Sequence, residues 1–163
     1  MKQLIIIRHG KAEEYDFINS DFERSLTKKG KQISRDIAEK LGKKGIRFDA
    51  IYSSPAFRAI ETAIIFADEL GFPFSEIKLK KEIYSGFCSE SLQEILQTVE
   101  NEHNAIAIVG HNPGLTDIAS ELTGYSDIYM PKTSVVVIES VAENWTDFFQ
   151  QKRKLLLFEK NKK

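Results

Sequence analysis

The sequence is poor in cysteine and proline. It has one cysteine, Cys88, and four prolines among its 163 residues. A single cysteine cannot form an internal disulfide, and it excludes a structural zinc site built from several cysteines. A chain without disulfides fits a reducing compartment, so we expect a cytoplasmic protein. No repeat or Pro/Gly-rich linker divides the chain, and we expect a single domain over residues 1–163.

The sequence also lacks an excess of charge of one sign and a long apolar run. Its 23 basic and 24 acidic side chains give a formal net charge of −1. This net charge does not attract nucleic acid or an anionic membrane, so a bound anion must be held by a local cluster of cations. The apolar run at residues 4–7 is too short for the core of a signal peptide. No segment approaches the ~20 apolar residues that span a bilayer, and we expect neither nucleic acid nor membrane as a partner.

Apolar runs alternate with amphipathic segments along the whole chain. This alternation predicts an α/β protein, a three-layer α/β/α sandwich with a mostly parallel central sheet. The lysine-rich tail after the last strand is expected to fray. We predict strands at 3–7, 49–53, 77–84 (the least certain), 105–109, 133–140 and 154–158, and helices after Thr27, from Ser54-Pro55 to Gly71, over 90–101 and from Asn112-Pro113 to Gly124.

Three segments rich in polar side chains follow predicted buried strands. They are Arg8-His9-Gly10, Ser53-Ser54-Pro55 with the nearby Arg58, and Gly110-His111-Asn112-Pro113. The carboxyl ends of parallel strands share one edge of a sheet, and ligands bind at that edge in open α/β sheets. We therefore expect the three segments to converge on one site.

The converging side chains suit a phosphate group. Arg8 and Arg58 can each hold two phosphate oxygens, and helix N-termini add free N–H groups. His9 lies beside these guanidinium groups, which disfavour its protonation and keep the imidazole neutral and nucleophilic. His111 can donate a hydrogen bond to the oxygens of a phosphoryl group in transfer. The pattern predicts phosphoryl chemistry with His9 as the nucleophile.

Four segments of the chain resemble one known family. They are residues 4–12 (LIIIRHGKA), 21–30 (DFERSLTKKG), 53–63 (SSPAFRAIETA) and 109–114 (VGHNPG). In order and spacing they are similar to the histidine phosphatase superfamily, which has the phosphoglycerate-mutase-like fold, and most of all to its short SixA-type phosphohistidine phosphatases. The resemblance implies a phosphohistidine intermediate on His9 in a pocket completed by Arg8, Arg58 and His111. Water would hydrolyse the intermediate, with no metal and no organic cofactor.

The general acid and the substrate stay open at this stage. In larger members of the family a carboxylate protonates the leaving group, and the resemblance leaves three alternatives here: Glu82, Asp21 or no general acid. No cap-sized insertion is visible, which suits a phosphorylated protein, and a phosphohistidine needs less help from an acid. We therefore expect a protein phosphohistidine phosphatase. The alternatives are a phosphatase for small phosphorylated metabolites and a phosphate-binding module without turnover.

Several neighbouring residues have weaker assignments. Asp21 and Arg24 can pair to hold their loop, although Arg24 could also touch substrate, and Lys11 could add to the field of the pocket. Glu61 is expected on the helix surface or in support of the pocket. A zinc site on His9, His103 and His111 is an alternative, which the adjacent arginines disfavour by repelling a cation.

Overall fold

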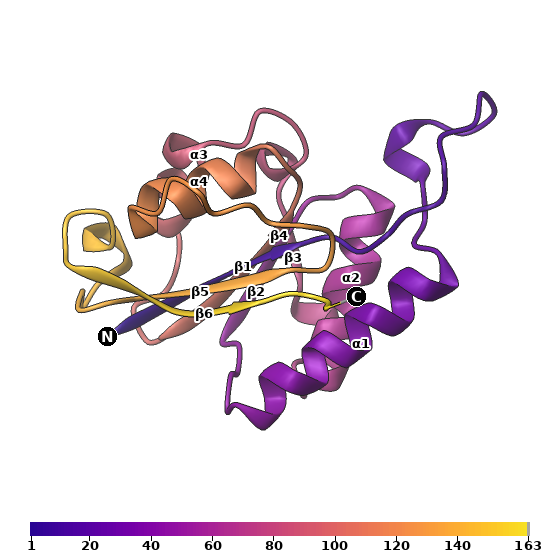
Figure 1. Cartoon of the computed structure of the whole chain (residues 1–163). Helices are drawn as coiled ribbons and strands as arrows, with labels where there is room; N and C mark the ends of the chain where they lie inside the picture. Colours follow the sequence, from indigo (N-terminus) through magenta and orange to yellow (C-terminus); the bar gives the residue numbers. More distant parts are fainter. Residues whose placement is uncertain (163) are drawn as a thin grey trace.

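A computed structural model describes residues 1–162 and shows one six-stranded sheet with a pair of helices on each face (Figure 1). The strands are β1 (Lys2–Arg8), β2 (Ala50–Ser53), β3 (Lys78–Leu79), β4 (Ala105–Gly110), β5 (Val135–Ser140) and β6 (Arg153–Glu159). The helices are α1 (Lys28–Lys43), α2 (Phe57–Glu69), α3 (Ser89–Leu96) and α4 (Gly114–Thr123). Four short 3-10 turns lie at η1 (Asp21–Glu23), η2 (Phe74–Glu76), η3 (Lys81–Ile83) and η4 (Trp145–Asp147).

The sheet has the strand order β3-β2-β4-β1-β5-β6. β1 pairs in parallel with β4, β4 with β2, and β2 with β3. β5 is antiparallel to both of its neighbours, β1 and β6, so it alone runs against the other described strands. The predicted α/β class and mostly parallel sheet are confirmed.

β1 lies in the middle of the molecule because both of its faces are covered. Leu4 and Ile6 belong to the core under α3 and α4, whereas Ile5 and Ile7 belong to the core under α1 and α2. Figure 1 shows these helix pairs on opposite sides of the sheet. Side chains of a strand alternate between faces, so a continuous apolar run is what a strand covered on both sides requires.

Two of the four predicted helices start later than predicted, α2 by two residues and α4 by one. α1 begins as predicted, with the Thr27 hydroxyl accepting from the N–H of Gly30 at 2.9 Å. α2 begins only at Phe57, because the Ser54 hydroxyl accepts from the N–H of Ala56 at 3.2 Å and closes a turn ahead of the helix. α4 begins at Gly114, after a turn that contains Asn112. The side-chain oxygen of Asn112 accepts hydrogen bonds from the N–H and the hydroxyl of Thr116 in the first turn of α4.

Two other boundaries also differ from prediction. The segment 77–84 holds only the two-residue strand β3 and the turn η3, and α3 ends at Leu96 rather than at residue 101. The expectation of a frayed tail falls partly on residue 163, which lies outside the described residues. Within residues 1–162 no helix is long and apolar enough to cross a membrane.

Candidate active site

The three polar segments converge at the carboxyl edge of the sheet, as predicted. β1, β4 and β2 are adjacent, with Arg8 in register with Gly110. The rings of His9 and His111, which follow β1 and β4, have centroids 4.9 Å apart. Arg58, from the first turn of α2, contributes to the electrostatic environment of both histidines. Parallel pairing of these strands is what assembles the cluster.

His9 is held in one tautomer. Its Nδ1 lies 2.7 Å from the carbonyl oxygen of Gly10, which can only accept, so Nδ1 carries the proton and Nε2 keeps its lone pair. The side chain is 7% exposed. Burial lowers the pKa of His9 to about 3, with smaller contributions from His111, Arg58 and Arg8, against an opposing effect of the hydrogen bond to Gly10. The ring is therefore neutral at pH 7, and burial contributes more than the arginines that the sequence suggested.

His111 is also neutral. Burial and then the charge of Arg58 lower its pKa to about 4. Its Nε2 lies 2.8 Å from the hydroxyl oxygen of Ser54, while its buried Nδ1 has no partner in residues 1–162. Ser54 thus contacts the histidine directly, a role that the sequence did not suggest beyond a helix cap.

The two guanidinium groups are each anchored and still have donors to spare. Arg8 donates from Nη1 to the carbonyl oxygen of Met130 at 2.9 Å and to the Tyr129 hydroxyl at 3.3 Å. Arg58, 6% exposed, donates to the backbone oxygen of Asp21 at 2.7 Å and to its carboxylate at 3.0 Å. The buried Nε of both arginines has no partner among the described residues. Unsatisfied cationic donors of this kind are suited to an oxyanion.

Asp21 is a structural anion in this cluster. Its carboxylate accepts from Arg24 at 2.6 Å, from Arg58, and from the Tyr84 hydroxyl at 3.1 Å. Burial raises the pKa of Asp21, but the hydrogen bonds from Arg24 and Arg58 outweigh that effect and hold the pKa at about 2. The predicted Asp21–Arg24 pair is confirmed. Asp21 is ionised at neutral pH, so in this arrangement it has no proton to give.

A family model of the histidine phosphatase superfamily (branch 1) matches residues 4–116, which include both histidines and both arginines of the cluster. The chain belongs to this superfamily. It is a phosphatase.

Solved structures of this superfamily have the same fold. The chain superposes on the protein histidine phosphatase SixA complexed with tungstate with a TM-score of 0.81 at 22% identity, covering 96% of this chain and 95% of that one. A SixA-type protein from Nakamurella multipartitia gives a TM-score of 0.84 at 18% identity, with 98% and 95% covered. Among curated sequences, a Picosynechococcus protein of unassigned function is 28% identical over 149 residues, or 86% of each chain.

The cluster has one aromatic member that sequence reasoning missed. Tyr84 lies with its ring centroid 5.6 Å from that of His111 and 5.2 Å from that of Phe22. Burial and the neighbouring Asp21 carboxylate raise the pKa of the Tyr84 hydroxyl. Its position in the segment after β3, at the same edge of the sheet, is the signal that could have indicated it.

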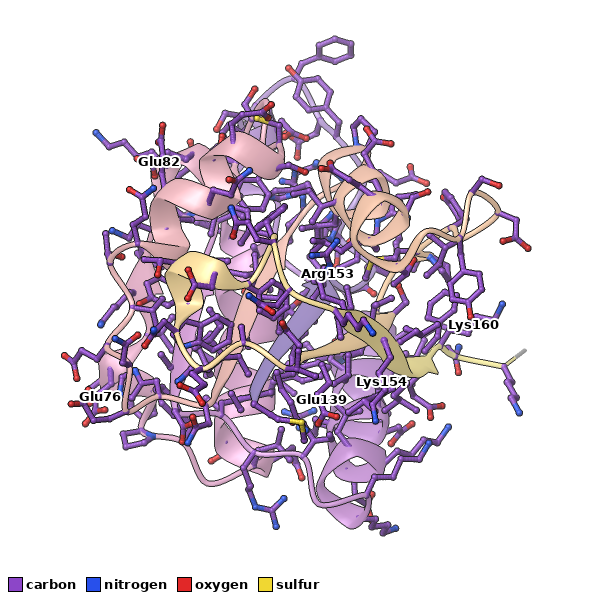
Figure 2. The ribbon with its side chains drawn as sticks, turned by 90° about the vertical axis from the view of Figure 1, so that its left-hand side faces the viewer. Glu76, Glu82, Glu139, Arg153, Lys154 and Lys160 are labelled. Atoms are coloured by element: carbon purple, nitrogen blue, oxygen red, sulfur yellow. The ribbon has the colours of Figure 1, made fainter. Side chains whose placement is uncertain are left out.

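Glu82 lies apart from the cluster. It is exposed in η3 at the periphery of the phosphatase (Figure 2), and no hydrogen bond or ion pair of residues 1–162 includes it. The structure thus brings together Arg8, His9, Arg58 and His111, but within residues 1–162 Glu82 makes no hydrogen bond or ion pair with them.

A second layer of hydrogen bonds supports His9 and its loop. The hydroxyl of Thr62 accepts from the N–H of Gly10 at 3.0 Å and donates to the carbonyl of Arg58. The Glu61 carboxylate accepts from the N–H of Leu26 at 2.6 Å, which ties α2 to the loop before α1. Glu61 is thus pocket-supporting, one of its two expected roles.

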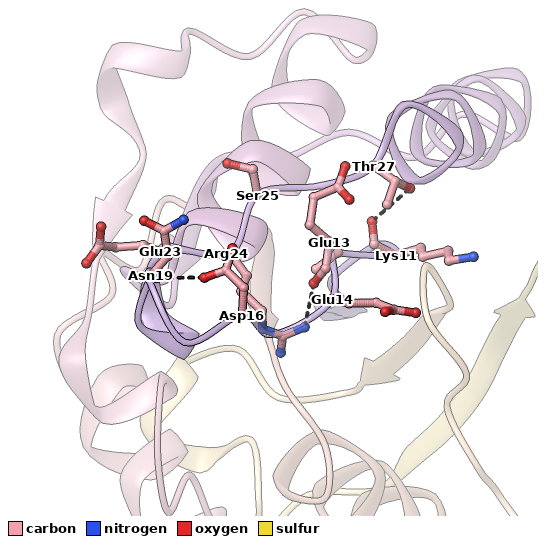
Figure 3. A pocket seen from close by; sticks show the side chains of 10 residues that line it. Lys11, Glu13, Glu14, Asp16, Asn19, Glu23, Arg24, Ser25 and Thr27 are labelled. Atoms are coloured by element: carbon pink, nitrogen blue, oxygen red, sulfur yellow. Dashed lines mark hydrogen bonds between the residues drawn. The ribbon is translucent and has the colours of Figure 1, made fainter.

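The loop between β1 and α1 encloses a cavity of about 620 Å³ beside the site (Figure 3). Four of its lining residues are acidic: Glu13, Glu14, Asp16 and Glu23. Arg24 spans this loop, donating to the carbonyl of Glu13 at 2.9 Å (Figure 3). It also pairs with Asp21. The acidic lining makes this cavity a poor place for phosphate.

The geometry does not support the alternative zinc site. His103 lies just before β4 and His111 just after it, at opposite ends of one strand, so the three histidines cannot share an ion. No cluster of three or more metal-ligating side chains occurs in the part of the chain that the structure describes.

Proposed function

We propose that the protein hydrolyses phosphohistidine on a partner protein, with Nε2 of His9 as the nucleophile. The observation that carries this proposal is the buried, neutral His9, whose Nδ1 is committed to Gly10. Nε2 attacks phosphorus as the bond from phosphorus to the leaving nitrogen breaks. Water then attacks the phosphoryl group on His9, releasing phosphate and returning the imidazole. This sequence of steps uses no metal and no organic cofactor.

Arg8 and Arg58 have the task of holding the phosphoryl oxygens. A phosphoryl transition state spreads negative charge over those oxygens, so fixed cations are the main source of acceleration. With both histidines neutral, Asp21 pairs with Arg24 and Arg58, and Arg8 adds a third cation to the cluster. The excess of cations matches a phosphate dianion. His111 adds an N–H donor from the other side.

The leaving group favours phosphohistidine over an ester. An alkoxide needs a proton as it leaves, but Asp21 is ionised, and Glu82 is exposed and has no hydrogen bond to the cluster within residues 1–162. The imidazole of a phosphohistidine can carry its own proton and leave as a neutral ring. No covering domain lies over the edge of the sheet that carries His9 and His111 in residues 1–162, which leaves room for a phosphorylated protein surface. The single cysteine, exposed in this fold, is compatible with the cytoplasm as the compartment.

Turnover of two substrates tests the proposal. We expect the protein to dephosphorylate a phosphohistidine-carrying protein faster than an unactivated alkyl phosphate, and to carry acid-labile phosphate during turnover. His9→Ala removes the nucleophile, whereas His103→Ala changes a histidine at the opposite end of β4 and is the matched control. The proposal is wrong if His9→Ala keeps the parent rate. Binding of vanadate with no covalent intermediate and no turnover would instead favour a binding module.

A further inference from the structure

A second cavity, of about 320 Å³, adjoins the acidic loop cavity and shares Lys11 with it. Arg8, Lys11, Lys29 and Lys132 line it, and none of its lining residues is acidic. Arg8 thus belongs both to this cavity, which we call the basic cavity, and to the site around His9. A chain with a net charge of −1 has gathered four cations at one place beside its catalytic histidine.

The lysines of the basic cavity are not neutralised by the protein. No ion pair or hydrogen bond within residues 1–162 involves the amino groups of Lys11, Lys29 or Lys132, although ion pairs elsewhere engage Lys43 and Lys154. Like charges held close together repel, and a bound anion relieves that repulsion. These three lysines therefore have no acidic partner in direct contact among the described residues.

One wall of the basic cavity is the first turn of α1, where lysines stand in place of the acidic residues that a helix N-terminus favours. That turn carries Lys28, Lys29 and Lys31 and has no acidic residue. Cations at a helix N-terminus oppose the helix dipole and cost about 0.3–1 kcal/mol each. The turn also packs tightly on the chain beside it, since a Cβ on Gly30 would lie 2.2 Å from the carbonyl oxygen of Lys11. Close packing holds Lys11 and Lys29 together in spite of their charge.

The opposite wall holds backbone strain. Thr133 has a φ of 56°, in the left-handed region that β-branched residues rarely adopt, and it is buried. Its N–H donates to the carbonyl oxygen of His9 at 3.1 Å. A strained residue costs roughly 1–3 kcal/mol and persists where the surroundings impose it, typically at functional sites. Here the strained backbone joins Lys132 and its side of the cavity directly to His9.

We propose that the basic cavity binds a second anionic group of the substrate, a carboxylate or a phosphate, while Arg8, His9 and Arg58 hold the phosphoryl group that is transferred. This inference rests on the proposed phosphatase function and narrows its substrate class to molecules with a second anion close to the phosphoryl group. Arg8 lies between the two positions and contributes to both. The shared chemistry is an acidic side chain beside a phosphohistidine or a second anion on a small molecule.

Binding of unreactive phosphonates tests the cavity without turnover. Calorimetry would compare phenylphosphonate with its ortho-, meta- and para-carboxylated derivatives on the full chain. We expect at least one carboxylated ligand to bind about tenfold more tightly than phenylphosphonate, the effect of one added charge-assisted hydrogen bond. Rising salt should shrink this difference. Equal affinity for all four ligands, provided that phenylphosphonate binds, would overturn the inference.

Charge-removing variants locate the effect. Lys29→Gln combined with Lys132→Gln should abolish the advantage of the carboxylated ligand and leave the affinity for phenylphosphonate within about twofold. Lys28→Gln removes the same charge from the same helical turn, outside the cavity, and should keep the advantage. An advantage that survives the double variant, or an equal loss for both kinds of ligand, would contradict the assignment.

Turnover separates this inference from the proposed function and identifies the source of the anion. The protein could bind a carboxylated phosphonate more tightly than phenylphosphonate and yet hydrolyse no phosphohistidine protein. The proposal for the basic cavity would then be supported, and the proposed reaction would be wrong. If phosphohistidine peptides with flanking glutamates are turned over about tenfold faster than peptides with glutamines, and the double variant removes this, the anion belongs to a protein. If the double variant slows turnover only of carboxylated phenyl phosphates, the second anion belongs to a small molecule.

Discussion

At the amino end of β1, Lys2 is buried and fully satisfied, whereas at the carboxyl end of the same strand Arg8 keeps an unused donor. Lys2 is 1% exposed, and its amino group donates to the carbonyl oxygens of Asn101 and His103 and to the side chain of Asn104 at 3.0 Å. Arg8 has a buried Nε with no partner in residues 1–162. One strand thus carries two cations, of which Lys2 has all its donors satisfied and Arg8 does not.

The neighbours of each cation extend this contrast. Near Lys2, the Trp145 indole donates to the carbonyl of His103 at 2.7 Å, and only Nδ1 of His103 is buried without a partner. At the other end, Arg8, Arg58 and His111 each have such an atom. Buried polar groups are almost always satisfied within a protein, so a concentration of exceptions marks a place that a ligand completes. The amino end is therefore structural and the carboxyl end functional.

Arg58→Met should give the largest effect that separates the two ends. Loss of a guanidinium that meets transition-state charge lowers kcat/KM by about 10²–10³-fold. The fold should survive, because Asp21 keeps its bonds to Arg24 and Tyr84. Steady-state kinetics with a phosphohistidine substrate measures the loss, and circular dichroism checks the fold. Arg35→Met, on an exposed position of α1, is the control. A folded Arg58→Met protein with parental kcat/KM would refute the contrast.

Lys2→Met should have the opposite profile. The substitution removes a donor from three acceptors at the amino end, of which only the His103 carbonyl keeps another donor, the Trp145 indole. We expect the free energy of unfolding to fall by about 2–4 kcal/mol. The folded variant should keep its kcat/KM, because Lys2 lies at the far end of β1 from His9. Urea denaturation and kinetics on the same sample measure both quantities. Lys43→Met breaks only an exposed pair with Glu39 and should change stability little. A large loss of activity in folded Lys2→Met would show that the ends are coupled.

The two ends of β1 also differ in how well the sequence predicted them. The carboxyl end was predictable, because Arg8, His9, Arg58 and His111 follow buried strands or open a helix, and parallel pairing brings such positions together. The amino end was not predictable, because the partners of Lys2 lie about a hundred residues away in the chain, with a separation of 99 to Asn101. Local sequence carries no signal for a contact of that range.

The errors within the site have the same physical origin. Ser54 has the sequence of a helix cap, but its hydroxyl closes a turn and contacts His111 instead. Tyr84 and the basic cavity are assembled from segments that are separate in the chain, so only the fold reveals them. The pKa of His9 depends mainly on burial, which neighbouring residue types do not report. Periodicity predicted the elements, and tertiary contacts decided their ends and their partners.

The carboxyl end should also make the fold sensitive to acid. His9 and His111 have pKa values lowered from 6.5 to about 3 and about 4, so below pH 6.5 the unfolded chain binds protons that the folded chain does not. Stability must then fall as the pH drops from about 6.5 towards 4, by at most about 1.4 kcal/mol per pH unit for each histidine. Urea denaturation at several pH values measures the slope. His9→Asn combined with His111→Asn should flatten it, and an unchanged slope would assign the acid loss elsewhere.

The smallest expected effect is a change in stability that distinguishes Lys29, a cation placed for binding, from Lys2, a cation placed for structure. Lys29→Gln removes a charge that opposes the dipole of α1, so we expect the free energy of unfolding to rise by about 0.3–1 kcal/mol, the reverse of Lys2→Met. Lys28→Gln should give a similar gain, because it occupies the same turn. Only Lys29→Gln should also weaken binding of a carboxylated phosphonate, because only Lys29 lines the basic cavity. Denaturation curves and calorimetry on the two variants measure both quantities. A loss of stability in Lys29→Gln would mean that this lysine supports the fold, and the reason for placing it at a helix N-terminus would then be structural rather than the binding of an anion.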